Sequence, residues 1–195
     1  MEKDESSLEK LSVKGTGLSV AEIYQKKTLK VWLAVMVRMF HEQRIGELLT
    51  KNGIENFVPL QKEYHKWSDR MKLINHVVIP RVVFVRVAPI ERRQVLELPS
   101  AVKYVVACGE HQPAIIPDNQ INSFKFMLGA SDNAVNIIDR PMRKGEKVKI
   151  IRGPLANLEG ELITINSEKE VGVYLNAFGY ACVNVPIENI QVLSD

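Results

Sequence analysis

The sequence has few of the features that mark secreted, membrane or fibrous proteins. Only two cysteines, Cys108 and Cys182, occur among 195 residues, which excludes a disulfide framework and a cysteine-based zinc site. The apolar runs are shorter than the roughly 18 residues that a membrane span needs. The first residues, MEKDESSLEK, lack the apolar core of a secretion signal. We therefore expect a soluble, cytoplasmic protein.

Neither sign of charge dominates the chain. The 26 Lys and Arg residues exceed the 23 Asp and Glu residues by a net charge of +3, which excludes a polybasic, histone-like protein. The excess is uneven: residues 29–138 hold 14 basic and 10 acidic side chains, whereas residues 139–195 hold seven basic and eight acidic. Any nucleic-acid surface is therefore expected on the middle segment.

Composition divides the chain into four parts. Residues 1–28 are rich in Lys, Glu, Ser and Gly without a strong hydrophobic period, and we expect a flexible tail. A first domain covers residues 29–135 and a second covers residues 144–195. The segment between them, 136–143, is predicted to be a linker, because the polar stretch Asp139–Gly145 carries both Pro and Gly.

The first domain shows strand and helix patterns in turn. The run HVVIPRVVFVRVA is the strongest strand signal, and Pro80 within it marks a strand start or a bulge, since proline has no backbone donor. The predicted strands are Lys30–Val37, Ile54–Pro59, His76–Ala88 and Val102–Ala107, with a hairpin or long loop at Gln61–Asn75. The predicted helices are His41–Asn52, Pro89–Leu98 and Pro117–Gly129. This order predicts an α+β domain with helices on a mostly antiparallel sheet.

The second domain has a different rhythm. Short apolar runs recur with turn residues every eight to ten positions, which is typical of a small all-β barrel. The predicted strands are Glu146–Ile151, Leu158–Asn166, Glu170–Asn176, Ala181–Pro186 and Ile190–Leu193.

The start of the second domain resembles a KOW motif. Residues 145–160 read GEKVKIIRGPLANLEG, in which Val148 and Ile150 share a strand face and Gly153-Pro154 turns the chain. The first domain resembles the NusG N-terminal (NGN) domain in the order of Val31–Val35, Val58-Pro59, Pro80–Val85 and Pro113–Pro117. The resemblance covers residues 30–195 and implies an NGN α/β sandwich with an antiparallel sheet, followed by an SH3-like KOW barrel.

Some residues resemble specialised NusG paralogues more than the housekeeping factor. Pro113–Pro117 is similar to the RfaH version, and Arg70–Lys72 with Pro80-Arg81 is similar to UpxY antiterminators of capsule operons. The resemblance implies a monomeric, non-enzymatic factor that binds the RNA polymerase clamp helices, limits pausing and promotes read-through of capsular polysaccharide operons. The residues it implies for polymerase binding are Met36, Val82, Phe84, Tyr104 and Ile116.

Two further partners follow from the residues and the resemblance. Cations interleaved with aromatics at positions 61–81 suit single-stranded DNA, since cations hold phosphates and rings stack on bases. The candidates for contact with the non-template strand are Lys51, Lys66, Arg70, Lys72, Arg92 and Arg93. In NusG relatives the KOW barrel recruits a small ribosomal-subunit protein or Rho, and the candidate residues here are Leu155, Phe178 and Tyr180. Leu155 and Tyr180 depart from the family pattern, which argues against Rho and leaves ribosomal coupling open.

Two alternatives remain. The first is a ribosome-associated or translation-related RNA-binding protein that uses the KOW barrel, although the acidic balance of that domain counts against it. The second is a hydrolase built on Cys108 and His111, which share a loop but lack an orienting third group. One Cys and one His also do not complete a zinc site. We therefore expect no catalysis, no cofactor and no metal.

Overall fold

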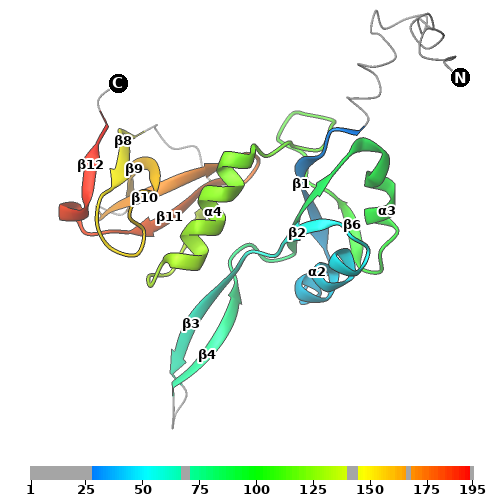
Figure 1. Cartoon of the computed structure of the whole chain (residues 1–195), viewed down its shortest axis with the longest axis horizontal. Coiled ribbons are helices and arrows are strands. Elements are labelled where there is room, and N and C mark those ends of the chain that lie inside the picture. Colours follow the sequence, from blue (N-terminus) through cyan, green and yellow to red (C-terminus); the bar gives the residue numbers. More distant parts are fainter. Residues whose placement is uncertain (1–27, 67–70, 140–144, 166–167, 194–195) are drawn as a thin grey trace, which may run out of the picture.

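The first domain is built on a four-stranded antiparallel sheet. The computed structural model describes residues 28–66, 71–139, 145–165 and 168–193 (Figure 1). The sheet has the order β2 (Glu55–Phe57), β5 (Val82–Val87), β1 (Val31–Val37), β6 (Ala101–Tyr104). Strands β1 and β5 read VWLAVMV and VVFVRV, continuous apolar runs that indicate burial on both faces. The predicted α+β class with an antiparallel sheet is confirmed.

One face of this sheet is covered by two helices that follow its strands. Helices α2 (Glu42–Lys51) and α3 (Arg92–Leu96), the latter preceded by the 3-10 turn η2 (Pro89–Glu91), lie on this side. Alternate strand residues Leu33, Val35, Val83 and Val85 pack with buried helix residues such as Leu49. We call these four strand residues the helical face. The predicted helix and strand assignments of this region hold to within a few positions at their ends.

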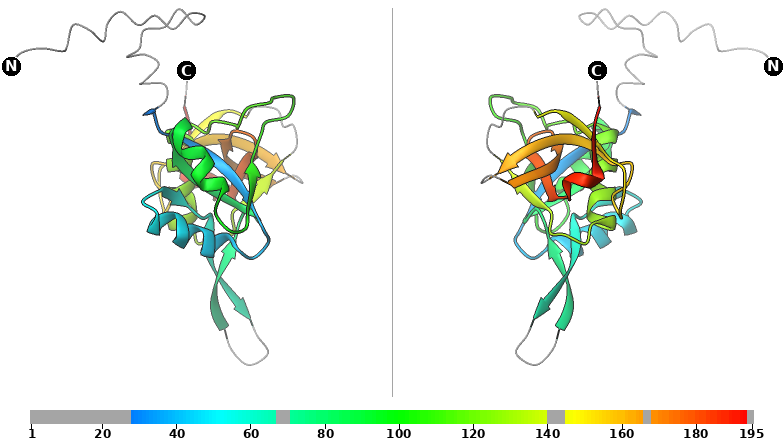
Figure 2. Two further views of the ribbon diagram at one scale, coloured as in Figure 1. Left: turned by 90° about the vertical axis from the view of Figure 1, so that its right-hand side faces the viewer. Right: turned by 90° about the vertical axis from the view of Figure 1, so that its left-hand side faces the viewer.

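The predicted strand His76–Ala88 is broken at Pro80. Strand β4 (Met71–Val77) ends before it and β5 begins after it, and Arg81 adopts a φ of 65° in the turn between them. Strands β3 (Leu60–Lys66) and β4 pair with each other alone, so they form a two-stranded hairpin that projects from the body (Figures 1 and 2). Pro80 has no backbone N–H to donate to a β-ladder, so the strand is interrupted at the position predicted from the sequence.

The second domain is an all-β unit, here called the C-terminal β-domain. Its six-stranded sheet has the order β12 (Ile190–Val192), β8 (Lys147–Ile150), β9 (Glu159–Ile165), β10 (Glu168–Leu175), β11 (Gly179–Asn184), β7 (Asn136–Ile138), with η3 (Ile187–Asn189) before β12. Strand β7 lies within the range predicted as linker. Its pairing with β11 requires a small residue at Gly179, where an added Cβ would meet the Ile138 carbonyl oxygen.

Helix α4 (Asp118–Ala130) stands between the first domain's sheet and the C-terminal β-domain (Figure 1). Its buried residues Ile121, Phe124 and Met127 join a single apolar cluster with Phe84 of β5 and Phe178 of the second domain. The two domains therefore share one core. No helix in the described part of the chain is long and apolar enough to cross a membrane.

Candidate functional site

Four of the five residues predicted to bind polymerase lie together on one face of the sheet. Met36 pairs with Val82 across β1 and β5, and Ala34 pairs with Phe84, so their side chains point to the same side. Ile116 joins them through a bridge to Trp32. Met36, Val82, Phe84 and Ile116 are called the Phe84 face below; it is opposite to the helical face.

Tyr104 lies away from this group. It pairs with Val35 and packs into the cluster under α2 and α3, on the opposite side of the sheet. Its hydroxyl donates a hydrogen bond of 2.9 Å to the Arg92 carbonyl, and burial raises the pKa of Tyr104 to about 12. The structure therefore assigns Tyr104 to the helical side of the core.

The Phe84 face is covered rather than hollow in this state. The Phe178 ring lies edge-on to Phe84 with centroids 5.6 Å apart, and Phe57 and Phe124 surround the same ring at 5.9 and 6.2 Å. Phe84 is 0% exposed, whereas an open concavity would have left it accessible. The expected apolar hollow is thus filled by the turn between β10 and β11.

Hydrogen bonds fix that turn in place. The Asn176 backbone N–H donates to Oε1 of Gln120 in α4 at 2.9 Å, and Asn176 Nδ2 donates to the Ile115 carbonyl at 2.8 Å. Away from the turn, Asn133 Nδ2 donates to the carbonyl of Asn184 at the end of β11 at 2.9 Å. Such bonds contribute about 0.5–1.5 kcal/mol each, less than the burial of an aromatic ring. They set the register of a contact that is mainly apolar.

A buried glutamine ties the hairpin to the same region. Gln61 of β3 is 2% exposed; its Nε2 donates to the Asn133 carbonyl at 2.8 Å and its Oε1 accepts from the Val135 N–H at 2.9 Å. The bonds hold the segment that leads from α4 into β7. Gln61 is not among the residues predicted from the sequence. The one signal of its burial is its position beside Leu60, at the end of an apolar strand pattern.

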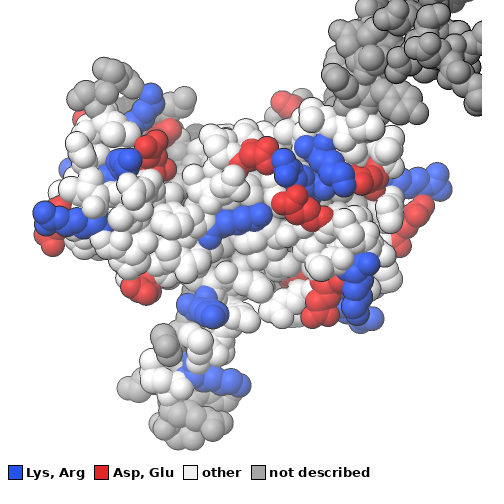
Figure 3. Space-filling view, in the orientation of Figure 1, with Lys and Arg blue, Asp and Glu red and all other residues white. Residues whose placement is uncertain are grey.

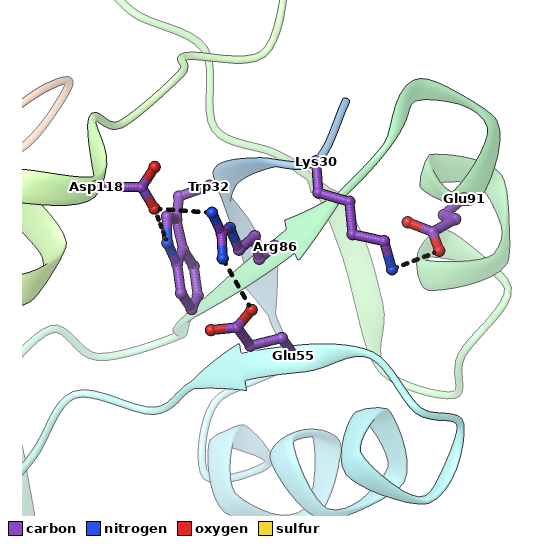
Figure 4. A network of polar contacts seen from close by, with 6 residues as sticks. All are labelled: Lys30, Trp32, Glu55, Arg86, Glu91 and Asp118. Atoms are coloured by element: carbon purple, nitrogen blue, oxygen red, sulfur yellow. Dashed lines mark hydrogen bonds and ion pairs between the residues drawn. The ribbon is translucent and has the colours of Figure 1, made fainter. Parts of the chain in front are cut away.

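A polar network borders the Phe84 face (Figure 4). Trp32 Nε1 donates to Asp118 at 3.0 Å, and Arg86 bridges Asp118 and Glu55 at 3.4 Å to each. Trp32 itself is buried, and the Lys125 ammonium lies 4.3 Å from its ring. Since both carboxylates are largely exposed, the ion pairs contribute little stability, and the network mainly orients the start of α4.

A separate ion pair lies at η2 (Figure 4). Lys30 Nζ lies 2.9 Å from Glu91. The Ala88 backbone N–H, together with Lys30, lowers the pKa of Glu91. The ion pair connects the residue before β1 to the η2 turn that follows β5.

The DNA candidates within the described residues are spread over four elements. Lys51 is exposed at the end of α2, and Lys72 is exposed on β4 of the hairpin. Arg93 is exposed on α3 but forms an ion pair of 2.9 Å with Glu97, and the neighbouring Arg92 is half-buried.

The two remaining candidates lie in or near the hairpin. Lys66 lies on β3, and Arg70 lies outside the described residues. Figure 3 shows basic side chains on both the hairpin and the body, separated by neutral surface. The structure does not gather them into one patch.

The three candidates for the KOW partner are all buried. Leu155, Phe178 and Tyr180 are exposed by only 6%, 9% and 7%. Tyr180 donates a hydrogen bond of 2.8 Å to Glu161, and burial followed by this carboxylate raises the pKa of Tyr180 to about 12. Of the three, Phe178 contacts the first domain. In this state, therefore, none of the three side chains is exposed enough to contact a second partner.

The alternative catalytic pair, Cys108 and His111, lies in the loop that follows β6, and His111 is exposed. Cys108 is exposed and Cys182 is buried. Among the described residues there is no group of three or more His, Cys, Asp or Glu side chains that could hold a metal ion.

Comparison with known proteins connects the first domain to a family. Residues 30–125 match the NusG family model, described as transcription termination factor nusG. The first domain therefore has a NusG-like N-terminal (NGN) fold. The match spans the sheet and most of α4, and so includes the whole Phe84 face. No curated protein matches the chain.

Solved structures of NusG and Spt5 are also similar to the chain. A structure titled "Domain interaction in Thermotoga maritima NusG" has a TM-score of 0.44 and 18% identity, covering 85% of this chain and 98% of that one. The MjSpt4:Spt5 complex in conformation A has a TM-score of 0.27 and 16% identity, covering 84% of this chain and 98% of that one.

Proposed function

We propose that this chain is a transcription elongation and antitermination factor that binds RNA polymerase through the Phe84 face. The observation that carries the proposal is the contact between Phe84 and Phe178. In a NusG-like domain, the face on which sequence analysis placed polymerase binding is covered by a second domain.

The Phe84 face has the chemistry to bind a helical partner. It presents an aromatic ring flanked by aliphatic side chains, a surface that suits the apolar side of an amphipathic helix pair such as the polymerase clamp helices. Met36 is half-buried at its edge, and its flexible thioether adapts to a partner's shape. The partner would replace the apolar contacts that Phe178 makes in the closed state.

Docking of the C-terminal β-domain on the Phe84 face lowers the apparent affinity of the chain for polymerase. A partner that needs the Phe84 face binds only the fraction of molecules in which the C-terminal β-domain has moved away, so its apparent affinity falls by that fraction. Burial of a Phe side chain contributes about 1.5–3 kcal/mol, so the Phe178 contact alone would lower affinity about 10- to 100-fold. Recruitment then requires a signal or a binding partner that favours the open state.

The same contact masks the predicted second site. Phe178 is both the residue that covers Phe84 and a candidate for recruiting a small ribosomal-subunit protein. Release would therefore expose both surfaces together, and coupling to a second partner would follow polymerase binding. Action at capsular polysaccharide operons, with contact to the non-template strand, is proposed from the resemblance to UpxY and RfaH factors.

Replacement of Phe178 tests the proposal. We expect Phe178→Ser to bind polymerase about 10- to 100-fold more tightly than the unaltered chain, because the cover is lost. Adding Met36→Glu should abolish this gain while circular dichroism stays native. Tyr174→Ser is the matched control, since Tyr174 is a 46% exposed aromatic on β10. Equal binding by Phe178→Ser and the control would refute the role of this face.

A further inference from the structure

A cavity lies where the two domains meet beyond the end of α4. One wall comes from the segment between α4 and β7, and the other from the turn after β8, the end of β11 and η3. The space measures about 360 Å³ including its open mouth, which is within the range of small-molecule sites, about 300–1,000 Å³. We call it the seam cavity. Its main lining residues are Asp132, Asn133, Arg152, Leu155, Val185 and Asn189.

Hydrogen bonds hold both walls of the seam cavity. The Asn133 carbonyl accepts from Gln61 Nε2 at 2.8 Å, and Asn133 Nδ2 donates to the Asn184 carbonyl on the other wall at 2.9 Å. Within that other wall, the Ile151 N–H donates to the Asn189 carbonyl at 2.8 Å. The cavity is therefore formed before a ligand arrives, so that little conformational entropy is lost on binding.

The floor of the seam cavity is apolar. Leu155 and Val185 are 6% and 7% exposed, and both belong to the cluster that joins the two domains. Leu155 is one of the residues predicted to bind a partner of the KOW barrel, and the structure places it in this floor instead of on a free surface. An aliphatic group would cover these two side chains without the burial of an unpaired polar atom.

The rim of the seam cavity carries one charge of each sign, on different walls. Asp132 is exposed and lies two residues beyond the end of α4, where the last helix carbonyls add a partial negative charge. Arg152 is exposed in the turn after β8. Neither side chain forms an ion pair with the other or with any other described residue. The site therefore has a place for a cation on one wall and for an anion on the other.

We propose that the seam cavity binds a small zwitterion, an α-amino acid with an aliphatic side chain. Its ammonium group pairs with Asp132 at the α4 terminus, and its carboxylate accepts hydrogen bonds from the Arg152 guanidinium. Its side chain packs on Leu155 and Val185. A ligand with a single charge would leave one of the two rim side chains without a partner. Because the amino acid bridges the two domains, it binds the closed state more tightly than the open one.

Occupation of the seam cavity opposes release of the C-terminal β-domain. A ligand that binds only the closed state, present at ten times its Kd, lowers the apparent affinity for polymerase about 10-fold. The concentration of the amino acid would thereby set the fraction of chains that is open. The binding site follows from the cavity and its charges alone, whereas this effect on polymerase rests on the proposed function.

Titration calorimetry with L-leucine as the probe tests the site on the full chain. One L-leucine should bind per chain and raise the melting temperature. Binding should be about 5- to 10-fold weaker for 4-methylpentanoate, which lacks the amino group, and for 3-methylbutylamine, which lacks the carboxylate, a loss between those of an exposed ion pair and a buried charged hydrogen bond. Asp132→Asn and Arg152→Gln should weaken L-leucine binding by the same factor.

Two control variants and one domain-opening variant complete the test. Glu188→Gln and Lys169→Gln remove exposed charges of the C-terminal β-domain that do not line the cavity, and should leave L-leucine binding unchanged. Phe178→Ser should bind L-leucine more weakly, because opening separates the two walls.

Three results would overturn the proposal. They are an absence of L-leucine binding, equal affinity for L-leucine and the two singly charged analogues, and unchanged L-leucine binding by Asp132→Asn and Arg152→Gln. Unchanged L-leucine binding by Phe178→Ser would overturn the bridging of the domains. If L-leucine binds as expected but Phe178→Ser binds polymerase no more tightly than the unaltered chain, the proposed function fails and the amino-acid site remains.

Discussion

The two faces of the NusG-like sheet are both buried, but different parts of the chain cover them. The helical face is closed by α2 and α3, which follow the sheet strands within the same domain. The Phe84 face is closed by α4 together with a turn of the C-terminal β-domain, about 90 residues further along the chain. A local cover forms with the domain, whereas the proposed function requires the cover from the C-terminal β-domain to leave while the sheet stays folded. This difference is the basis of the proposal that the Phe84 face is the one available to a partner.

The largest expected effect is on the helical face. Leu49 of α2 is 0% exposed, and Leu49→Ala should lower the free energy of unfolding of the NusG-like domain by about 2–5 kcal/mol, since a cavity remains. Urea denaturation followed by circular dichroism measures the loss. Leu96→Ala on α3, 40% exposed, is the control and should cost less than about 1 kcal/mol. If Phe178→Ser destabilised this domain as much as Leu49→Ala, the two faces would not differ.

A smaller effect is expected at Gln61. Gln61→Leu removes two hydrogen bonds and leaves the buried Val135 N–H unpaired, at a cost of about 1–3 kcal/mol. The cost should appear as faster hydrogen exchange in Asn136–Ile138, because β7 loses its anchor, and as tighter polymerase binding. Gln191→Leu, an exposed glutamine on β12, is the control. Unchanged exchange in β7 would show that Gln61 does not support domain docking.

The smallest effect is a dependence on alkaline pH. Tyr180 pairs with Ile138 of β7, and its pKa is raised from 10.0 to about 12, chiefly by burial and then by Glu161. Because the folded pKa exceeds the unfolded one, the stabilisation is complete below pH 10.0 and is lost as pH rises towards 12. Burial also raises the pKa of Tyr104 and of Cys182 to about 12, so Tyr180→Phe should lessen this decline in thermal melts without abolishing it, and Tyr174→Phe should lessen it much less. Parallel declines in all three proteins would argue against Tyr180 as the titrating group.

Much of the fold could be predicted from local patterns. The continuous apolar strand Val31–Val37 indicated burial on both sides, and Pro80 marked the break between β4 and β5. The resemblance to the NusG family, rather than these patterns, grouped Met36, Val82, Phe84 and Ile116, which the structure brings to one face. Tyr104 was grouped with them because sequence order does not say on which face a short strand such as β6 turns its side chain.

The domain docking could not be predicted, because local periodicity does not identify distant contacts. Phe178 in a turn looked like an exposed recognition residue, and only the fold places it on Phe84. Strand β7 was hidden in a polar segment, since three residues at a sheet edge carry little pattern of their own. Gln61 is polar by sequence and is buried because its two bonds are satisfied by backbone from another element.

A reversible lock between the domains tests the central claim most directly. The backbone N–H of Asn176 bonds the side chain of Gln120 across the interface, so Gln120→Cys and Asn176→Cys can be joined by a short, reducible thiol crosslinker, with Cys108→Ser removing the exposed native thiol. The account predicts that the locked chain does not bind RNA polymerase and that reduction, or omission of the crosslinker, restores binding. Equal polymerase binding by the locked and unlocked chains would contradict it.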